Sequence, residues 1–383
     1  NICSGSLRSL WKVSASLMIS FLSATAMMLF DRLFLSYYST SALTAATSSG
    51  TFYWAGCCLW MAVAGIAEVF VAQKNGAKHY KQLGAPVWQM SYLALLSICF
   101  FLMLSHFGSL FFYNHGIMNA DEYTFYRWNN LFAPLLIFFS AFASFYIGQG
   151  KTSLIKWLAL LGNGINILLD PLFIFGVPGW IPQMGIKGAA IATGSGLFVQ
   201  VFVLLVMFLH RKNREHFGTN DFRFQPEIFR QCIKIGLPPA IFIFFELLGW
   251  TAFYLMMKKI SGHHLIVSSV TQTILVFFLF FSMGLEKGAA AAAGNLIGAK
   301  QLNEVKKVFR SGIILSLLFT LILAVFLIGY PDTILSWFFK NPQALGLTEL
   351  NMSITQLPAV KTSIKFAMTI LVIYLTFENI RFY

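Results

Sequence analysis

The sequence predicts an all-α polytopic membrane protein, and three observations lead to this fold class. Of the 383 residues, 57% are hydrophobic and 11% are charged, whereas soluble globular chains carry about 25% charged residues. The apolar residues come in blocks of about 20 or more, the length that crosses a ~30 Å hydrocarbon core as a helix. The alternating segments of about ten residues that a membrane β-barrel needs are absent from the sequence. The chain therefore belongs in a lipid bilayer.

The apolar blocks and the loops between them predict the topology. We predict ten spans, at roughly 10–37, 51–73, 86–112, 125–148, 154–176, 187–209, 235–257, 265–293, 311–330 and 360–380. The loops after spans two, six and eight are basic and read KNGAKHYK, HRKNRE and GAKQLNEVKKVFR, while STSALTAATSSG and NADE carry no positive charge. Since short basic loops stay in the cytoplasm, the N-terminus is predicted to be cytoplasmic. The same placement explains the net charge of +13 without a nucleic-acid partner.

An internal repeat predicts two lobes of the same orientation. Gly76-Ala77-Lys78 recurs as Gly298-Ala299-Lys300, which defines a constant offset in numbering between the two copies. The repeat unit holds six spans, an even number, so both copies are oriented alike, as in the parallel repeats of some transporters. We expect a first lobe at 1–215 and a second lobe at 216–383. The second copy stops about two spans early, which predicts that the sequence is a piece of a twelve-span protein.

Acidic residues inside apolar spans are the strongest functional signal. An Asp at a helix centre costs about 2.5–3.5 kcal/mol on insertion scales, so such a residue faces a bundle interior or a cavity. Six of the fourteen acids lie in spans or near their ends: Asp31, Glu68, Asp170, Glu246, Glu286 and Glu378. Glu286 is followed by Lys287, which allows a local charge pair. Glu68 lies near the cytoplasmic end of span two, where a long side chain can reach the interface.

Asp170 ranks first because of its surroundings in NILLDPLFIFG. Asn166 lies four residues earlier and projects from the same helix face. Pro171 lacks an amide hydrogen, which leaves the carbonyl of Ile167 without its helical partner. One patch thus offers carboxylate, amide and carbonyl oxygens, the ligands that a hard cation accepts. We therefore predict a switchable cation site, the alternative being a satisfied polar contact at a helix kink.

Three further residues complete the candidate set. Asp31, near the outer end of span one, lies at a depth like that of Asp170, and Thr193 in span six can line the same lobe. For Thr193, ordinary packing of small residues is an equal alternative. Glu246 lies near the middle of span seven in the second repeat, where a carboxylate facing a cavity suits an organic cation or a proton.

No enzyme chemistry is predicted. The sequence has no HExxH motif, no paired Ser/His set and no Walker loop. Its five cysteines show neither metal-binding nor disulfide spacing. A membrane-embedded transferase would need an intramembrane His/Asp or metal-ligand constellation, and a purely structural membrane protein would not need carboxylates at depth. We expect no cofactor beyond a coupling ion, H+ or Na+, and no certain metal site.

Successive motifs resemble the MATE (multidrug and toxic compound extrusion) family. In order along spans one to eight they read LFDRLFLS, GIAEVFVAQKNGA, NILLDPLFIFG with GIKGAAIAT, IGLPPAIFIFFELLGW and AAAAAGNLIGAK. The resemblance implies two six-helix lobes around a V-shaped cavity, alternating access, and extrusion of cationic lipophilic compounds in exchange for H+ or Na+. It also implies a monomer in the bacterial inner membrane.

The resemblance is greatest to the DinF-like branch, whose first-lobe cation site has an Asp in span one and an Asn, an Asp and a Thr in spans five and six. Position by position, these are Asp31, Asn166, Asp170 and Thr193. The first three make Na+ one candidate ligand. Glu246 matches the acidic residue of span seven that other branches use, so the resemblance leaves open which lobe couples transport.

One position departs from the family pattern. Family members usually have a proline early in span one. Its repeat partner is kept as Pro238, yet the position that the repeat pairs with Pro238 is occupied by Ser16. Helix kinks are therefore predicted at Pro171 and Pro238 but not at Ser16.

The nearest rival function is a flippase for lipid-linked oligosaccharides or peptidoglycan precursors. A flippase would favour a cationic cavity for the pyrophosphate headgroup of its substrate. The intramembrane charges here lean acidic, which favours a transporter of cations instead.

Overall fold

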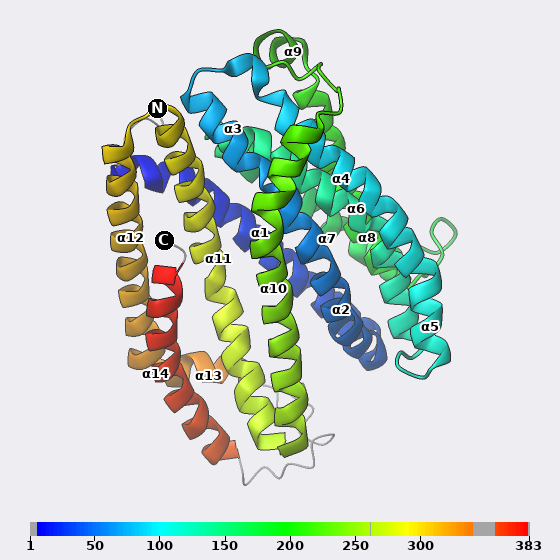
Figure 1. Cartoon of the computed structure of the whole chain (residues 1–383). Helices are drawn as coiled ribbons and strands as arrows, with labels where there is room; N and C mark the ends of the chain where they lie inside the picture. The colour runs from blue at the N-terminus through cyan, green and yellow to red at the C-terminus, as the bar shows by residue number, and fades with distance from the viewer. Residues whose placement is uncertain (1–5, 261, 340–356, 382–383) are drawn as a thin grey trace.

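The computed structural model describes residues 6–260, 262–339 and 357–381 (Figure 1). Within these ranges the regular structure is helical, apart from one isolated bridge between Val177 and Ile181. In the described part of the chain, ten helical stretches are long and apolar enough to cross a membrane, which confirms the predicted number. The helices are α1 Leu7–Tyr38, α2 Thr40–Gly65, α3 Ala67–Gly76, η1 Tyr80–Gln82, α4 Gly84–Met103, η2 Leu104–Gly108, α5 Ser109–Asn114, α6 Ala120–Gly148, α7 Thr152–Ile174, α8 Ile186–Phe208, α9 Arg211–Phe217, α10 Pro226–Ile260, α11 Gly262–Gly298, α12 Leu302–Gly329, α13 Pro331–Phe339 and α14 Leu357–Arg381.

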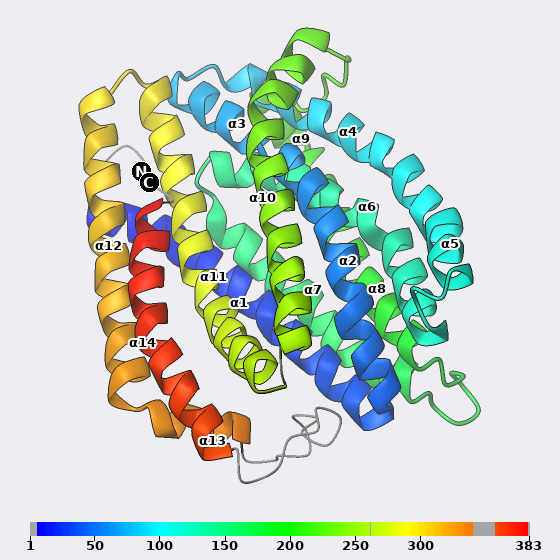
Figure 2. The same ribbon diagram turned by 60° about the horizontal axis from the view of Figure 1, so that its bottom comes forward.

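The helices form two groups, which we call the first lobe (α1–α8) and the second lobe (α10–α14). In both ribbon views α11, α12 and α14 pack together on one side, and α2, α4, α6 and α8 on the other (Figures 1 and 2). Helix α1 crosses between them. In its N-terminal half, Leu10 and Met18 pack with Leu285 of α11. Near its C-terminal end, Leu35 packs with Ile174 of α7. The exact boundary of the lobes near 215 stays a prediction.

The prediction that STSALTAATSSG forms a loop is wrong, because this stretch is the first half of α2. The side chain of Ser39 caps the helix by accepting a hydrogen bond from the backbone N–H of Ala42, at 2.9 Å. The hydroxyl of Ser49 donates to the carbonyl of Ala45 at 2.6 Å. Such internal bonds satisfy Ser and Thr hydroxyls inside a helix. The polar composition that indicated a loop is therefore compatible with a longer second span.

The Gly-Ala-Lys repeat marks a close approach of the two lobes. A Cβ atom added to Gly76 would lie 1.8 Å from the backbone oxygen of Asn295, and one added to Gly298 would lie 1.9 Å from the backbone oxygen of Gln73. Gln73 and Asn295 are themselves related by the offset of the repeat. The two contacts are therefore equivalent under the internal repeat, and each requires glycine because any side chain would overlap backbone atoms.

Both copies of the repeat end in the same backbone conformation. Lys78 and Lys300 have φ angles of 61° and 58°, and no other non-glycine residue in the described ranges has a positive φ. The connections that follow α3 and α11, which contain these lysines, lie at the same end of the molecule as α9, at the top of Figure 1. We call it the basic end and define it by the basic residues Lys78, Lys81, Arg211, Lys212, Arg214 and Lys300, which lie in or between short connecting segments.

Candidate cation site in the first lobe

Close packing of three helices creates the site. Helices α7 and α8 approach closely because glycines lie where they meet: a Cβ on Gly196 would lie 2.5 Å from the backbone oxygen of Gly162 and 3.4 Å from the Cβ of Asn166. A Cβ on Gly188 would lie 2.5 Å from the backbone oxygen of Phe173. Helix α1 packs along α7. Small residues at such contacts let backbones approach, and polar side chains then meet across them.

The four residues proposed from the sequence come together here. Asn166 donates from Nδ2 to the hydroxyl of Thr193 at 3.1 Å, and Thr193 donates to the carbonyl of Ala189, also at 3.1 Å. The carboxylate of Asp31 lies close enough to that of Asp170 for the two groups to interact electrostatically. The side chains of Asn166 and Thr193 also act on the Asp31 carboxylate. Three helices, α1, α7 and α8, thus contribute to one polar group.

The group holds more acceptors than donors. Asp170 and Asn166 are completely buried. Four buried oxygens have no hydrogen-bond partner: Oδ1 of Asp31, Oδ1 of Asn166 and both carboxylate oxygens of Asp170. Because ionised carboxylates have no hydrogen to donate, Asp31 and Asp170 can hydrogen-bond to each other only when one of them carries a proton. Two like charges this close disfavour each other, so the arrangement suits a proton or a hard cation.

A polar chain that the sequence analysis missed extends the site toward the basic end. Asn163 donates to the hydroxyl of Ser23 at 2.9 Å, and its own oxygen accepts from Gln200 at 3.5 Å. The spacing of Asn163 to Asn166 and Asp170, three and seven residues, places all three on one helix face. This spacing in the sequence could have identified Asn163 as part of the site. Ser23 and Gln200 carry no such mark in the sequence.

The predicted kink positions lie in helices that continue past them. Pro171 is inside α7, which ends at Ile174, so any distortion falls in its last turn. Pro238 is inside α10, which runs on to Ile260. Ser16, which replaces the usual proline, lies within α1, and its hydroxyl is 3.4 Å from that of Ser153 on α7.

The other intramembrane acids lie elsewhere. Glu246 is half buried on α10, in the second lobe. Glu378 is buried on α14. Glu68, whose side chain could have reached the membrane interface, is instead buried and forms an ion pair with Lys287 between the lobes. Within the described ranges no three His, Cys, Asp or Glu residues gather as a metal-binding group.

Comparison with known proteins supports the family assignment. The MatE family model matches residues 16–172 and 238–375. The chain belongs to the MATE family. The two matched segments begin at Ser16 and Pro238, the positions that the Gly-Ala-Lys repeat pairs with each other, so each copy of the repeat is one MATE unit. Members of this family are membrane transporters rather than enzymes.

Similar curated proteins carry names of multidrug resistance. The MATE chain is 25% identical over 336 residues to a probable multidrug resistance protein NorM from Thermotoga maritima, covering 85% of this chain and 70% of the relative. It is 27% identical over 220 residues to the multidrug resistance protein NorM of Photobacterium profundum, covering 56% and 47%. The chain spans about half the length of several curated relatives that it matches.

Solved structures share the fold. One described as the outward-facing conformation of a multidrug resistance MATE family transporter of the MOP superfamily has a TM-score of 0.82 at 18% identity, covering 99% of this chain and 81% of the other. Another is a MOP superfamily transporter from Pyrococcus furiosus Vc1, described by a reversed polarity of its binding pocket. It has a TM-score of 0.73 at 17% identity, covering 100% and 97%. These similarities confirm the two-lobe, all-α membrane fold.

Proposed function

We propose that this MATE protein is a cation-coupled antiporter that extrudes cationic lipophilic compounds by alternating access. The observation that carries the proposal is the facing pair of carboxylates, Asp31 and Asp170, which are short of hydrogen-bond donors inside the first lobe. Buried polar groups are normally satisfied, so orphaned carboxylate oxygens indicate a missing positive charge. H+ and Na+ are the candidate coupling ions, and Asn166 and Thr193 add oxygens that favour a metal ion.

Occupancy of this site provides a physical means of coupling. Without a cation, the two carboxylates repel each other across the contact of α1 with α7. A bound proton or Na+ removes that repulsion and so changes the relative energies of two arrangements of α1. Each charge that crosses the full membrane field contributes about 2.3 kcal/mol per 100 mV. An ion entering down its gradient can therefore drive the lobes between two states.

The proposal includes substrate class and orientation. Glu246, a half-buried carboxylate in the second lobe, suits an organic cation or a second coupling proton. The relatives named as multidrug resistance proteins support efflux of small organic compounds. By the positive-inside rule, the basic end and the N-terminus face the cytoplasm. The membrane in this proposal is a bacterial inner membrane.

Efflux of a fluorescent cationic dye from proteoliposomes tests the proposal. The protein is reconstituted, and dye movement is measured under an imposed pH gradient and, separately, a Na+ gradient. Asp170→Asn keeps the shape of the side chain and removes one charge, so gradient-driven transport should fall by at least about tenfold, the change that ~1.4 kcal/mol produces. Asp221→Asn, in the exposed segment before α10, is the matched control and should transport normally.

The outcomes separate the alternatives. If Asp170→Asn transports at the wild-type rate with the same ion dependence, coupling through the first lobe is wrong. Glu246→Gln then tests the second lobe in the same assay. If folded wild-type protein moves no dye under either gradient, the rival lipid-linked precursor flippase replaces the antiporter, and a labelled lipid-linked substrate becomes the probe.

A further inference from the structure

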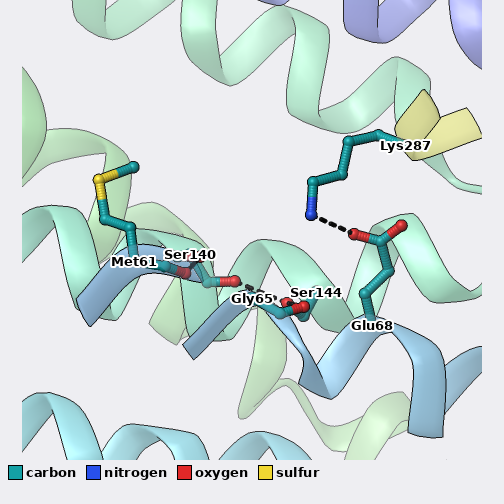
Figure 3. Close-up of polar contacts among 6 residues, drawn as sticks. All are labelled: Met61, Gly65, Glu68, Ser140, Ser144 and Lys287. Atoms are coloured by element: carbon teal, nitrogen blue, oxygen red, sulfur yellow. Dashed lines mark hydrogen bonds and ion pairs between the residues drawn. The ribbon is translucent and has the colours of Figure 1, made fainter. Parts of the chain in front are cut away.

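An ion pair with one buried and one partly exposed partner joins the two lobes. Lys287 of α11 places its Nζ atom 3.4 Å from Oε2 of Glu68 on α3 (Figure 3). The side chain of Glu68 is 3% exposed and that of Lys287 is 41% exposed. The two residues are 219 positions apart and belong to different lobes. Glu286, next to Lys287, acts electrostatically on both charges.

The first-lobe side of this pair is held in place by a break in the second span. Helix α2 ends at Gly65, and Glu68 lies in the first turn of α3. Two serines of α6 hold the end of α2: Ser140 donates to the carbonyl of Met61 at 3.0 Å, and Ser144 donates to that of Gly65 at 3.1 Å (Figure 3). Glu68 is therefore presented to the second lobe from a fixed backbone.

The pair lies farther from the basic end than the tightest contacts between the lobes. Glu68 precedes Gly76 by eight residues, and Lys287 precedes Gly298 by eleven. At 1.5 Å per helical residue, the pair lies about 12–16 Å inside these glycines. Between the glycines and the pair, Asn75 donates to the side chain of Asn295 at 2.6 Å. The ion pair thus lies farther from the basic end than this amide contact, along the same interlobe seam of α3 and α11.

The charge balance of the pair is incomplete. Oε1 of Glu68 is buried and has no hydrogen-bond partner, so Lys287 compensates this carboxylate through one oxygen. A buried ion pair adds little to stability relative to an apolar pair, but removal of one partner leaves an uncompensated charge and is costly. If α3 and α11 separate at the basic end, each lobe carries away one charge. The pair therefore opposes separation of the lobes.

We propose that Glu68 and Lys287 form an interlobe ion pair that stabilises the state in which the lobes are closed at the basic end. They are positioning residues for the transport cycle, and this role rests on the proposed alternating access. Removal of Lys287 strands the buried carboxylate of Glu68, whereas removal of Glu68 leaves an ammonium group that is partly exposed. The two single substitutions must therefore have unequal effects.

Distances between spin labels at the basic end test the proposal. Labels are attached at Lys81→Cys and Leu302→Cys, exposed positions on different lobes, in reconstituted protein whose native cysteines are replaced. Lys287→Met should raise the ratio of separated to closed lobes about tenfold, equivalent to about 1.4 kcal/mol. Glu68→Gln should raise it less, and the double variant should stay nearer to wild type than Lys287→Met alone.

Two further variants make the result specific. Reversal of both charges, Glu68→Lys with Lys287→Glu, should restore most of the closed population, which loss of packing alone does not predict. Lys307→Met is the matched control, because Lys307 pairs with Glu304 within α12, at 2.6 Å, on the surface of a single lobe. It should leave the distance distribution unchanged.

Unaltered distances in both Lys287→Met and Glu68→Gln would overturn the proposal, as would equal shifts in Lys307→Met and Lys287→Met. If Lys287→Met does not fold, Glu68→Gln and the charge-reversed pair carry the test. The distances are measured without dye or gradient, so they do not depend on transport. A shift in distances in protein that moves no dye would uphold the ion pair while the antiporter proposal fails.

Discussion

Replacement of Gly76 by alanine should disfavour closure of the lobes at the basic end. The Cβ of the new residue would lie 1.8 Å from the backbone oxygen of Asn295, whereas real Cβ contacts essentially never fall below 3.0 Å. The obstructing atom is backbone, so no side-chain rotation relieves the overlap. Helices α3 and α11 must move apart until this contact reaches at least 3.0 Å, a displacement that also separates Gly298 from Gln73.

The size of the effect follows from the cost of overpacking. Extra methylene-sized groups in a well-packed interface cost about 1–3 kcal/mol. A cost in this range shifts the equilibrium between closed and separated lobes by roughly 5–150-fold. The folding of each lobe should be little affected, because the overlap lies between the lobes and alanine is a better helix former than glycine by about 1 kcal/mol.

Spin labels at Lys81→Cys and Leu302→Cys report the result directly. In Gly76→Ala the closed population should decline, while the thermal midpoint changes little. Gly164→Ala is the matched control, since a Cβ at this glycine of α7 meets no atom within 4 Å. If Gly76→Ala keeps the wild-type distance distribution, the close approach of α3 and α11 is not a feature of the closed state and the reasoning fails.

Two further predictions concern stability. Ser144→Ala removes the hydroxyl that donates to Gly65 and should cost about 0.5–1.5 kcal/mol, seen as a lower thermal midpoint, with the exposed Ser336→Ala unchanged as control. Partial desolvation lowers the pKa of Lys151, an exposed residue between α6 and α7, below 10.5. The unfolded chain then binds this proton more tightly, so stability should rise with pH between the lowered pKa and 10.5. Lys151→Met should flatten that rise across a series of thermal midpoints, and an unchanged slope would contradict the shift.

Sequence reasoning was most successful where the signal is local. The number of spans was predicted correctly because a membrane helix is recognised by the composition of about 20 consecutive residues. The start of α2 was missed for a related reason. Its Ser and Thr residues read as polar, although their hydroxyls bond to carbonyls one turn earlier in the same helix. Composition alone does not distinguish a polar loop from a helix with internally satisfied side chains.

The candidate cation site was predictable in part. The shared helix face of Asn166 and Asp170 follows from their spacing, and the family resemblance added Asp31 and Thr193. Ser23 and Gln200, which extend the polar chain, lie in other helices and were missed. Their contribution depends on how α1 and α8 are rotated against α7, and that rotation leaves no pattern in single spans.

By itself, the sequence determined that the protein crosses a bilayer as apolar helices, that it contains an internal repeat, and that it belongs to a family of transporters. Only the tertiary structure decided which distant residues meet: Gly76 with Asn295, and Glu68 with Lys287. The physical reason is that membrane helices are apolar on most faces. Their sequences specify burial in lipid strongly and choice of packing partner weakly, so the partner is settled by shape and charge once all the helices are assembled.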